Sequence, residues 1–219
     1  MKLTDLINEQ HDFELTEEYP EGFDINSFKT IGSYAGKLRY AQEHLGKPIG
    51  SGSARTVYRV DKEKVLKLAK NKKGIAQNDQ ESNFYNDSYY ETIIAKVIDF
   101  DDKHFLWVEM EVAHRAKKSD FMRLWGIRFE DMGLYLSNRY EENKGRRGIY
   151  GINPDVLEKM NESDEIMHLV SFMYDSNQSA GDISKISSWG IVHRVDGEYL
   201  VLLDFGLSDD VYASYYGVN

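Results

Sequence analysis

The chain has 219 residues, 41% of them hydrophobic and 13% aromatic, which is enough to bury a core in one two-lobed domain or two small ones. Its formal net charge of −10 at pH 7 argues against an extended nucleic-acid-binding surface, and the absence of cysteine excludes disulfides and thiolate zinc sites. Because no apolar run approaches the ~18 residues of a membrane helix, and acidic residues interrupt the N-terminus before a signal peptide develops, we expect a cytoplasmic protein without a membrane partner.

Residues 1–46 form a polar, acidic arm in which no residue pattern is typical of chemistry. We expect a short helix near 2–9 and a second helix over 34–45, with a loose acidic segment between them. The sequence leaves open whether this arm packs on the rest of the chain or stays mobile.

Residues 47–112 predict an antiparallel sheet with one helix. Two strand-like runs, 57–60 and 65–68, flank a polar turn. The pattern then predicts a helix over 80–90 and strands over 93–100 and 105–112.

Residues 113–219 predict a mainly helical region. Apolar residues recur at helical spacing over 129–142, and Asn153 followed by Pro154 is a typical helix start. A further helix is expected over 166–174, restarting near Ser163, and a loop over 181–188. Strands at 191–195 and 198–203 should form a hairpin about Asp196-Gly197, which is a strong two-residue turn signal. The basic loop 143–147 is interpreted as solvated surface.

A loop of small residues lies between two of the expected strands. Gly50, Ser51, Gly52 and Ser53 would let backbone N–H groups approach a phosphate closely, and Val57 would then pack on an adenine ring. The alternative is a plain Gly/Ser hairpin loop.

Three charged residues follow this loop in a distinctive order. Lys67 lies among apolar neighbours on a strand, Glu81 lies in the expected helix, and Asp204 follows an apolar strand in the run Leu-Leu-Asp-Phe-Gly. Each has a structural alternative: a lysine stem that covers a sheet edge, a solvated helical glutamate, and a carboxylate in a tight turn.

Glycine loop, strand lysine, helix glutamate and Asp-Phe-Gly together resemble the protein kinase-like superfamily, including its aminoglycoside-type phosphotransferases and short phage and bacterial members. The resemblance implies an α+β, two-lobed protein kinase-like fold with ATP between the lobes. It makes 47–112 a small antiparallel-sheet N-lobe and 113–219 a reduced, mainly helical C-lobe.

The resemblance also implies roles for individual residues. Lys67 would contact the α- and β-phosphates and pair with Glu81, while Asp204 would bind Mg²⁺. Residues 105–108, followed by Glu109-Met110-Glu111, resemble the family's connector whose backbone binds adenine, and there Val108 would line the back of the nucleotide pocket. The backbone of Glu109 and Glu111 would contact adenine.

Two aspartates compete for the role of catalytic base. Gly181-Asp182 resembles the opening of the catalytic loop in the small-molecule phosphotransferases, and a carboxylate there could take the proton of a substrate hydroxyl. Asp196 lies in the expected hairpin turn, so we favour Asp182. The family's metal-binding asparagine falls on Ser187 by spacing, or on Ser188 with one residue inserted if Trp189-Gly190 matches the family's Asn-Trp-Gly; a hydroxyl is a poorer ligand than an amide. We therefore expect one Mg²⁺ rather than two.

Arg55 is another departure, because it replaces the third glycine of the family's loop; its guanidinium could contact phosphate itself. The leading hypothesis is an ATP-dependent phosphotransferase that acts on a protein or small-molecule hydroxyl and has no nucleic-acid partner, and the resemblance to short phage proteins suggests that it is phage-encoded. The alternatives are a pseudokinase that serves as a binding or inhibitory module and a protein that uses the fold only as a scaffold. For a viral protein the compartment would be the host cytoplasm.

Overall fold

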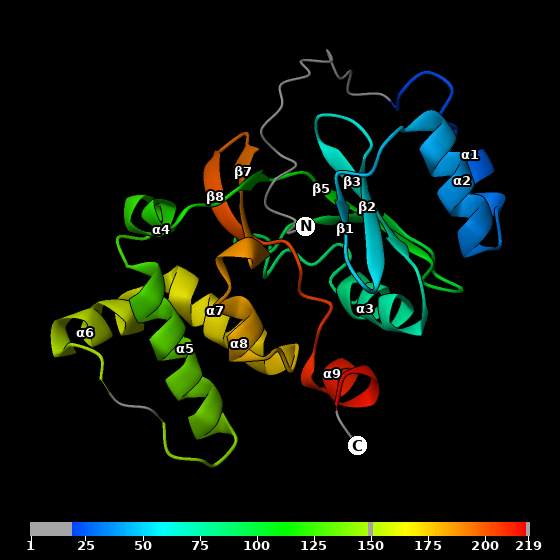
Figure 1. Cartoon of the computed structure of the whole chain (residues 1–219). Coiled ribbons are helices and arrows are strands. Elements are labelled where there is room, and N and C mark those ends of the chain that lie inside the picture. Colours follow the sequence, from blue (N-terminus) through cyan, green and yellow to red (C-terminus); the bar gives the residue numbers. More distant parts are fainter. Residues whose placement is uncertain (1–18, 149–150, 218–219) are drawn as a thin grey trace. The chain divides into compact units, whose positions relative to one another are not determined.

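The computed structural model describes residues 19–148 and 151–217, which form an α+β protein (Figure 1). The chain divides into two compact units. The first contains the described residues up to Asn86 together with Lys96–Val112, and the second contains Asp87–Ala95 and the described residues from Ala113 onward. The helix expected near 2–9 lies outside the described residues.

The first unit is built on a five-stranded antiparallel sheet. Its strand order is β1-β2-β3-β5-β4. The strands are β1 (Gly50–Ser51), β2 (Arg55–Arg59), β3 (Lys64–Ala69), β4 (Val97–Phe100) and β5 (Trp107–Glu111). The antiparallel sheet predicted for this region is therefore confirmed. β5 begins later than expected because the Asp101 carboxylate accepts backbone N–H bonds across a turn in which Phe105 has a φ of +50°, and β4 is shorter than expected because it begins only at Val97.

The described part of the N-terminal arm packs on this sheet. It forms α1 (Ile25–Thr30), which was not expected, and α2 (Tyr34–His44), which confirms the helix predicted over 34–45. The core beneath them combines arm and sheet side chains: Phe23, Phe28, Ala41, Tyr58, Val60, Leu66, Leu68 and Trp107. Burial of these apolar side chains holds the arm in place from residue 19 onward.

The one long helix between β3 and β4 lies elsewhere than predicted. The structure places α3 over Lys72–Ser82, so the helix expected over 80–90 is wrong. Asn71 starts α3 as its N-cap, accepting bonds from the backbone of Lys73 and Gly74. The chain after Ser82 forms turns instead.

The second unit contains a three-stranded sheet in the order β6-β7-β8. Its strands are β6 (His114–Arg115), β7 (Trp189–Arg194) and β8 (Gly197–Leu202). The predicted β7–β8 hairpin is confirmed, but its two turn residues are Val195 and Asp196, because Arg194 pairs with Gly197. Gly197 supplies the positive φ of +152° that closes the turn.

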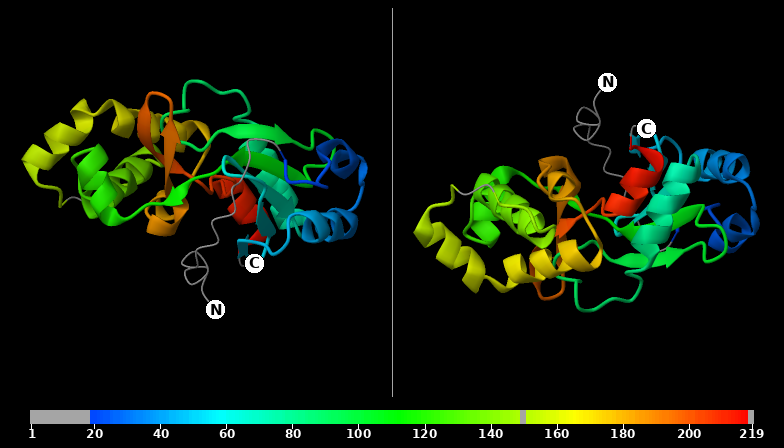
Figure 2. Two further views of the ribbon diagram at one scale, coloured as in Figure 1. Left: turned by 90° about the horizontal axis from the view of Figure 1, so that it is seen from above. Right: turned by 90° about the horizontal axis from the view of Figure 1, so that it is seen from below.

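Most of the second unit is helical, as predicted. Helices α5, α6 and α7 pack against one another and are coloured green to yellow in Figure 2. The helices are α4 (Lys118–Leu124), α5 (Phe129–Asn143), α6 (Pro154–Glu162), α7 (Asp164–Asp175), α8 (Ala180–Ile183) and α9 (Asp209–Tyr215). The segment expected to be a loop over 181–188 instead contains α8 and a 3₁₀ turn, Ile186–Ser188; the Ser179 hydroxyl caps α8 by accepting from the Gly181 N–H. No helix of the described residues is both long enough and apolar enough to cross a membrane.

Candidate functional site

A buried ion pair connects the sheet and the helix of the first unit. Lys67 lies in β3, and its Nζ is 2.9 Å from Oε1 and 3.1 Å from Oε2 of Glu81 in the last turn of α3. Lys67 is 7% exposed and Glu81 is 0% exposed. The two residues thus form the pair expected from the sequence. A buried carboxylate and ammonium in contact satisfy each other, whereas either one alone would be costly.

Lys67 also belongs to a row of side chains across the sheet. β2 and β3 pair Val57 with Lys67, and β3 and β5 pair Lys67 with Val108. Residues directly opposite each other in an antiparallel pair project from the same face. The expected adenine contacts, Val57 and Val108, therefore flank the expected phosphate contact on one face of the sheet. Gly50 pairs with Val57 and continues the row.

Two residues between β3 and α3 hold the small-residue loop. The Lys70 ammonium donates to Ser51 Oγ (2.5 Å) and to the Gly52 carbonyl (2.7 Å), while Asn71 Nδ2 donates to the Ser53 carbonyl (3.0 Å). These contacts occupy carbonyl oxygens of the loop and leave open space beside Gly52. Neither Lys70 nor Asn71 was an expected site residue, although an Asn before a polar run is a recognisable helix start.

Arg55 turns toward the protein interior. Its Nη1 lies 2.7 Å from Glu81 Oε2 and 3.4 Å from Asn78 Oδ1, and the residue is 7% exposed. The Glu81 carboxylate therefore forms ion pairs with two cations, Lys67 and Arg55. The sequence suggested a phosphate contact for Arg55 and gave no sign of this inward contact.

Glu109 and Glu111 follow Val108 in β5, and both are engaged in hydrogen bonds within the first unit. The buried Glu109 side chain projects from the face opposite to Lys67 and accepts from the Tyr19 hydroxyl at 3.0 and 3.1 Å. Burial raises the pKa of this carboxyl above its usual range. The Glu111 backbone N–H donates to the Lys96 carbonyl at 2.9 Å, so this group, expected to contact adenine, is engaged within the unit.

In the second unit, hydrogen bonds bring the other three expected residues close in the fold. The Ser188 hydroxyl donates to the Asp182 carbonyl at 3.0 Å, and the Leu203 N–H donates to the Ser188 carbonyl at 2.8 Å. The next residue, Asp204, is exposed, while Phe205 is buried with its ring edge against Phe172. Asp182 lies in α8, and its carboxylate forms an ion pair with Lys185.

Asp196 occupies the β7–β8 turn, as expected. Its carboxylate accepts from the Tyr199 hydroxyl at 2.7 Å. His193 and Arg194 before it lie on β7, again as expected.

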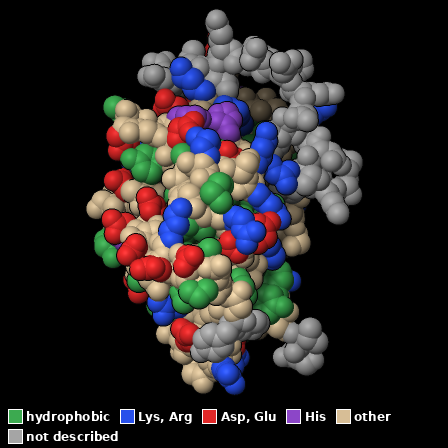
Figure 3. Space-filling view, turned by 90° about the vertical axis from the view of Figure 1, so that its left-hand side faces the viewer, with side chains coloured by type: hydrophobic (Ala, Val, Ile, Leu, Met, Phe, Trp, Pro, Cys, Tyr) green, Lys and Arg blue, Asp and Glu red, His purple; other side chains and the backbone are tan. Residues whose placement is uncertain are grey.

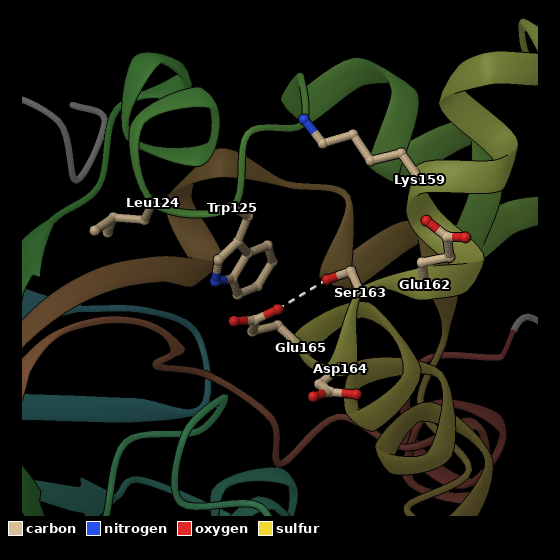
Figure 4. A pocket seen from close by; sticks show the side chains of 7 residues that line it. All are labelled: Leu124, Trp125, Lys159, Glu162, Ser163, Asp164 and Glu165. Carbon is tan, nitrogen blue, oxygen red and sulfur yellow. Dashed lines mark hydrogen bonds between the residues drawn. The ribbon is translucent and has the colours of Figure 1, made fainter.

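A separate pocket of about 360 Å³ lies in the second unit (Figure 4). It is lined by Leu124, Trp125, Lys159, Glu162, Ser163, Asp164 and Glu165. None of these is an expected site residue. Asp164 and Glu165 lie in the first turn of α7, where the helix dipole stabilises carboxylates, Glu162 ends α6, and Lys159 donates to the Gly126 carbonyl at 2.6 Å. We therefore assign this pocket no role.

Acidic and basic side chains are interspersed on the face drawn in Figure 3. Among the described residues, no group of three or more His, Asp or Glu side chains is arranged to hold a metal on its own.

No protein-family model matches the chain, and no curated protein matches it either.

Proposed function

We propose that this chain is a kinase-like, ATP-dependent phosphotransferase that acts on a hydroxyl of a protein or small molecule. The buried Lys67–Glu81 pair carries this proposal. It joins a strand that follows a small-residue loop to the next helix along the chain, which is the arrangement that kinases use to hold a phosphate-binding lysine. The strand order β1-β2-β3-β5-β4, with α3 between β3 and β4, supports a kinase-like N-lobe in the first unit.

In this proposal the first unit binds the nucleotide. The side chains of Val57 and Val108 would contact adenine, and Lys67 would contact the α- and β-phosphates beside the loop 50–54. The row that these residues form in register supports the assignment. Lys70 and Asn71 occupy the Gly52 and Ser53 carbonyls, and the Gly52 N–H donates to the Arg55 carbonyl at 2.9 Å, so an anion would bind N–H groups of the other loop residues.

The second unit would supply the catalytic groups. Asp204 and Ser188 fit a single Mg²⁺, because Mg²⁺ prefers oxygen ligands and keeps several waters. When bound, Mg²⁺ neutralises charge that develops on the transferred phosphoryl group. Asp182 would orient the acceptor hydroxyl and take its proton as the acceptor oxygen bonds to the γ-phosphorus and the bond to the β-phosphate breaks. Lys185 would keep the carboxylate in place.

A pseudokinase that binds nucleotide without transfer is the second candidate. The Ser188 hydroxyl already donates to the Asp182 carbonyl. A metal at Ser188 would share this oxygen with that hydrogen bond, which favours weak or absent catalysis.

The test is calorimetric titration of the full chain with ATP, with Mg²⁺ or with a chelator. Lys67→Ala should weaken ATP binding by ~1–3 kcal/mol, as expected for a lost charge-assisted contact. Lys64→Ala is the matched control, because Lys64 lies on the same strand but pairs with Asp61. Asp204→Ala should abolish the dependence on Mg²⁺.

Transfer of the γ-phosphate from radiolabelled ATP then separates the two candidates. If ATP binds equally well with chelator, and neither Lys67→Ala nor Asp204→Ala changes its affinity, the phosphotransferase proposal fails. Binding without any transfer would favour the pseudokinase.

A further inference from the structure

Arg55 connects the small-residue loop to helix α3. It follows Ala54 directly as the first residue of β2, and its side chain reaches Glu81 and Asn78 on α3. Arg59, four residues further along β2, instead donates to the carbonyls of Asp61 and Lys62 in the β2–β3 turn. Only the arginine beside the loop therefore engages the helix.

The two oxygens of the Glu81 carboxylate are shared between two cations. Lys67 lies 2.9 Å from Oε1 and 3.1 Å from Oε2, and Arg55 lies 2.7 Å from Oε2. Glu81 is fully buried, so rotation away from Arg55 would leave a charge without a partner inside the protein. Arg55 thus holds the carboxylate in the orientation in which both of its oxygens contact Lys67.

Further contacts pack the small-residue loop directly against helix α3. Gly74 of α3 sits so close to the loop that an added Cβ would lie 2.3 Å from the Ala54 carbonyl oxygen. Asn71, the N-cap of α3, donates to the Ser53 carbonyl of the loop at 3.0 Å. A displacement of the loop would therefore be transmitted to α3 and to Glu81.

We propose that Arg55 is a positioning residue that holds Glu81 against Lys67 and couples the phosphate loop to this ion pair. The inference rests on the proposed function, because the pair matters only if Lys67 binds phosphate. It differs from a direct phosphate contact by Arg55, since the guanidinium acts through Glu81.

A double-mutant cycle on the full chain tests this mechanism. ATP affinity in the presence of Mg²⁺ is measured by calorimetry for Arg55→Met, Glu81→Gln and the double variant, with Arg59→Met as the matched control. Arg55→Met should weaken ATP binding about tenfold or more, the scale for losing a group that orients a direct ligand. The double variant should bind no more weakly than Glu81→Gln alone, because residues that act through one another are not additive. Arg59→Met should leave the affinity unchanged.

Thermal unfolding of each variant separates positioning from stability. If Arg55→Met does not fold, Arg55→Lys replaces it: the ammonium keeps the charge but lacks the guanidinium fork, and ATP binding should then be weakened less than by Glu81→Gln. Wild-type affinity in a folded Arg55→Met or Arg55→Lys variant overturns the inference. A loss that adds fully to that of Glu81→Gln also overturns it, because Arg55 would then contact the nucleotide itself. Failure of the wild-type chain to bind ATP overturns the proposed function, and the inference with it.

Discussion

Asp182 and Asp196 differ in their position in the fold and in the contacts of the segments that hold them. Asp182 lies in α8, next to the Ser188 and Leu203 segments that lead to Asp204. Asp196 instead accepts from Tyr199 in an exposed hairpin turn. If the chain transfers phosphate, Asp182→Asn should lower turnover by roughly 10²–10⁴-fold, the usual scale for loss of a general base. Asp196→Asn is the control, and steady-state kinetics of both variants should leave its turnover near that of the wild type; the reverse result would exchange the two roles.

At the scale of single residues, the order of strands and helices along the chain was enough to predict which charged side chains form an ion pair. It was not enough to predict side-chain contacts that depend on how the helices pack. Lys67 and Glu81 could be paired from their order on a strand and a helix. Glu109 was grouped with Val108, although adjacent residues in a strand point to opposite faces. Strand alternation could have separated them. The inward turn of Arg55 could not be predicted, because it depends on where α3 lies.

At the scale of elements, helix α3 illustrates the limit of hydrophobic patterning. The strands β2 and β3 were predictable because apolar, β-branched residues mark them. The buried residues of α3 are instead small or polar: Gly74, Gln77, Asn78, Glu81 and Ser82. Periodicity in apolar residues therefore gave no signal, and the helix was predicted too late in the chain.

The same helix yields a prediction about packing. Alanine normally stabilises a helix relative to glycine. At Gly74, however, the new Cβ would meet backbone atoms, 2.3 Å from Ala54 O and 2.9 Å from Ala69 Cα. Gly74→Ala should therefore lower the free energy of unfolding by about 1–3 kcal/mol, the typical cost of overpacking. Urea unfolding measures the change.

Gly133→Ala in α5 is the matched control for this substitution. Its Cβ would meet the Ser184 hydroxyl at 3.2 Å, a side-chain atom that can rotate away. We expect a change below about 1 kcal/mol there. Equal effects of the two substitutions would mean that α3 is not seated against the backbone of the loop.

At the scale of the whole molecule, four described tyrosines donate to a carboxylate, and for all of them except Tyr199 burial is the largest cause of a raised pKa. Tyr19, Tyr90 and Tyr140 each donate a hydroxyl bond to a carboxylate, on Glu109, Asp175 and Asp209 respectively. Burial is the largest cause that raises the pKa of all three phenols, and the acceptor carboxylates add to it. Since the chain already carries a net charge of −10 at pH 7, every phenol that ionises adds to an excess of negative charge.

These tyrosines predict a loss of stability in base, and Tyr140 allows the clearest test. Burial and the 2.5 Å bond to Asp209 raise its pKa from 10.0 to about 12, while nearby Arg146 opposes the shift. A group whose pKa is higher in the folded state stabilises fully below the unfolded pKa and loses this contribution as pH rises through the folded pKa. The free energy of unfolding should therefore fall between pH 10 and about 12. Tyr140→Phe should make this fall shallower, as measured by urea unfolding at a series of pH values. Lys144 also forms an ion pair with Asp209. The same urea series on Lys144→Met therefore separates the contribution of this ion pair from that of the Tyr140 phenol. An equally steep fall in Tyr140→Phe would show that this phenol does not set the alkaline limit.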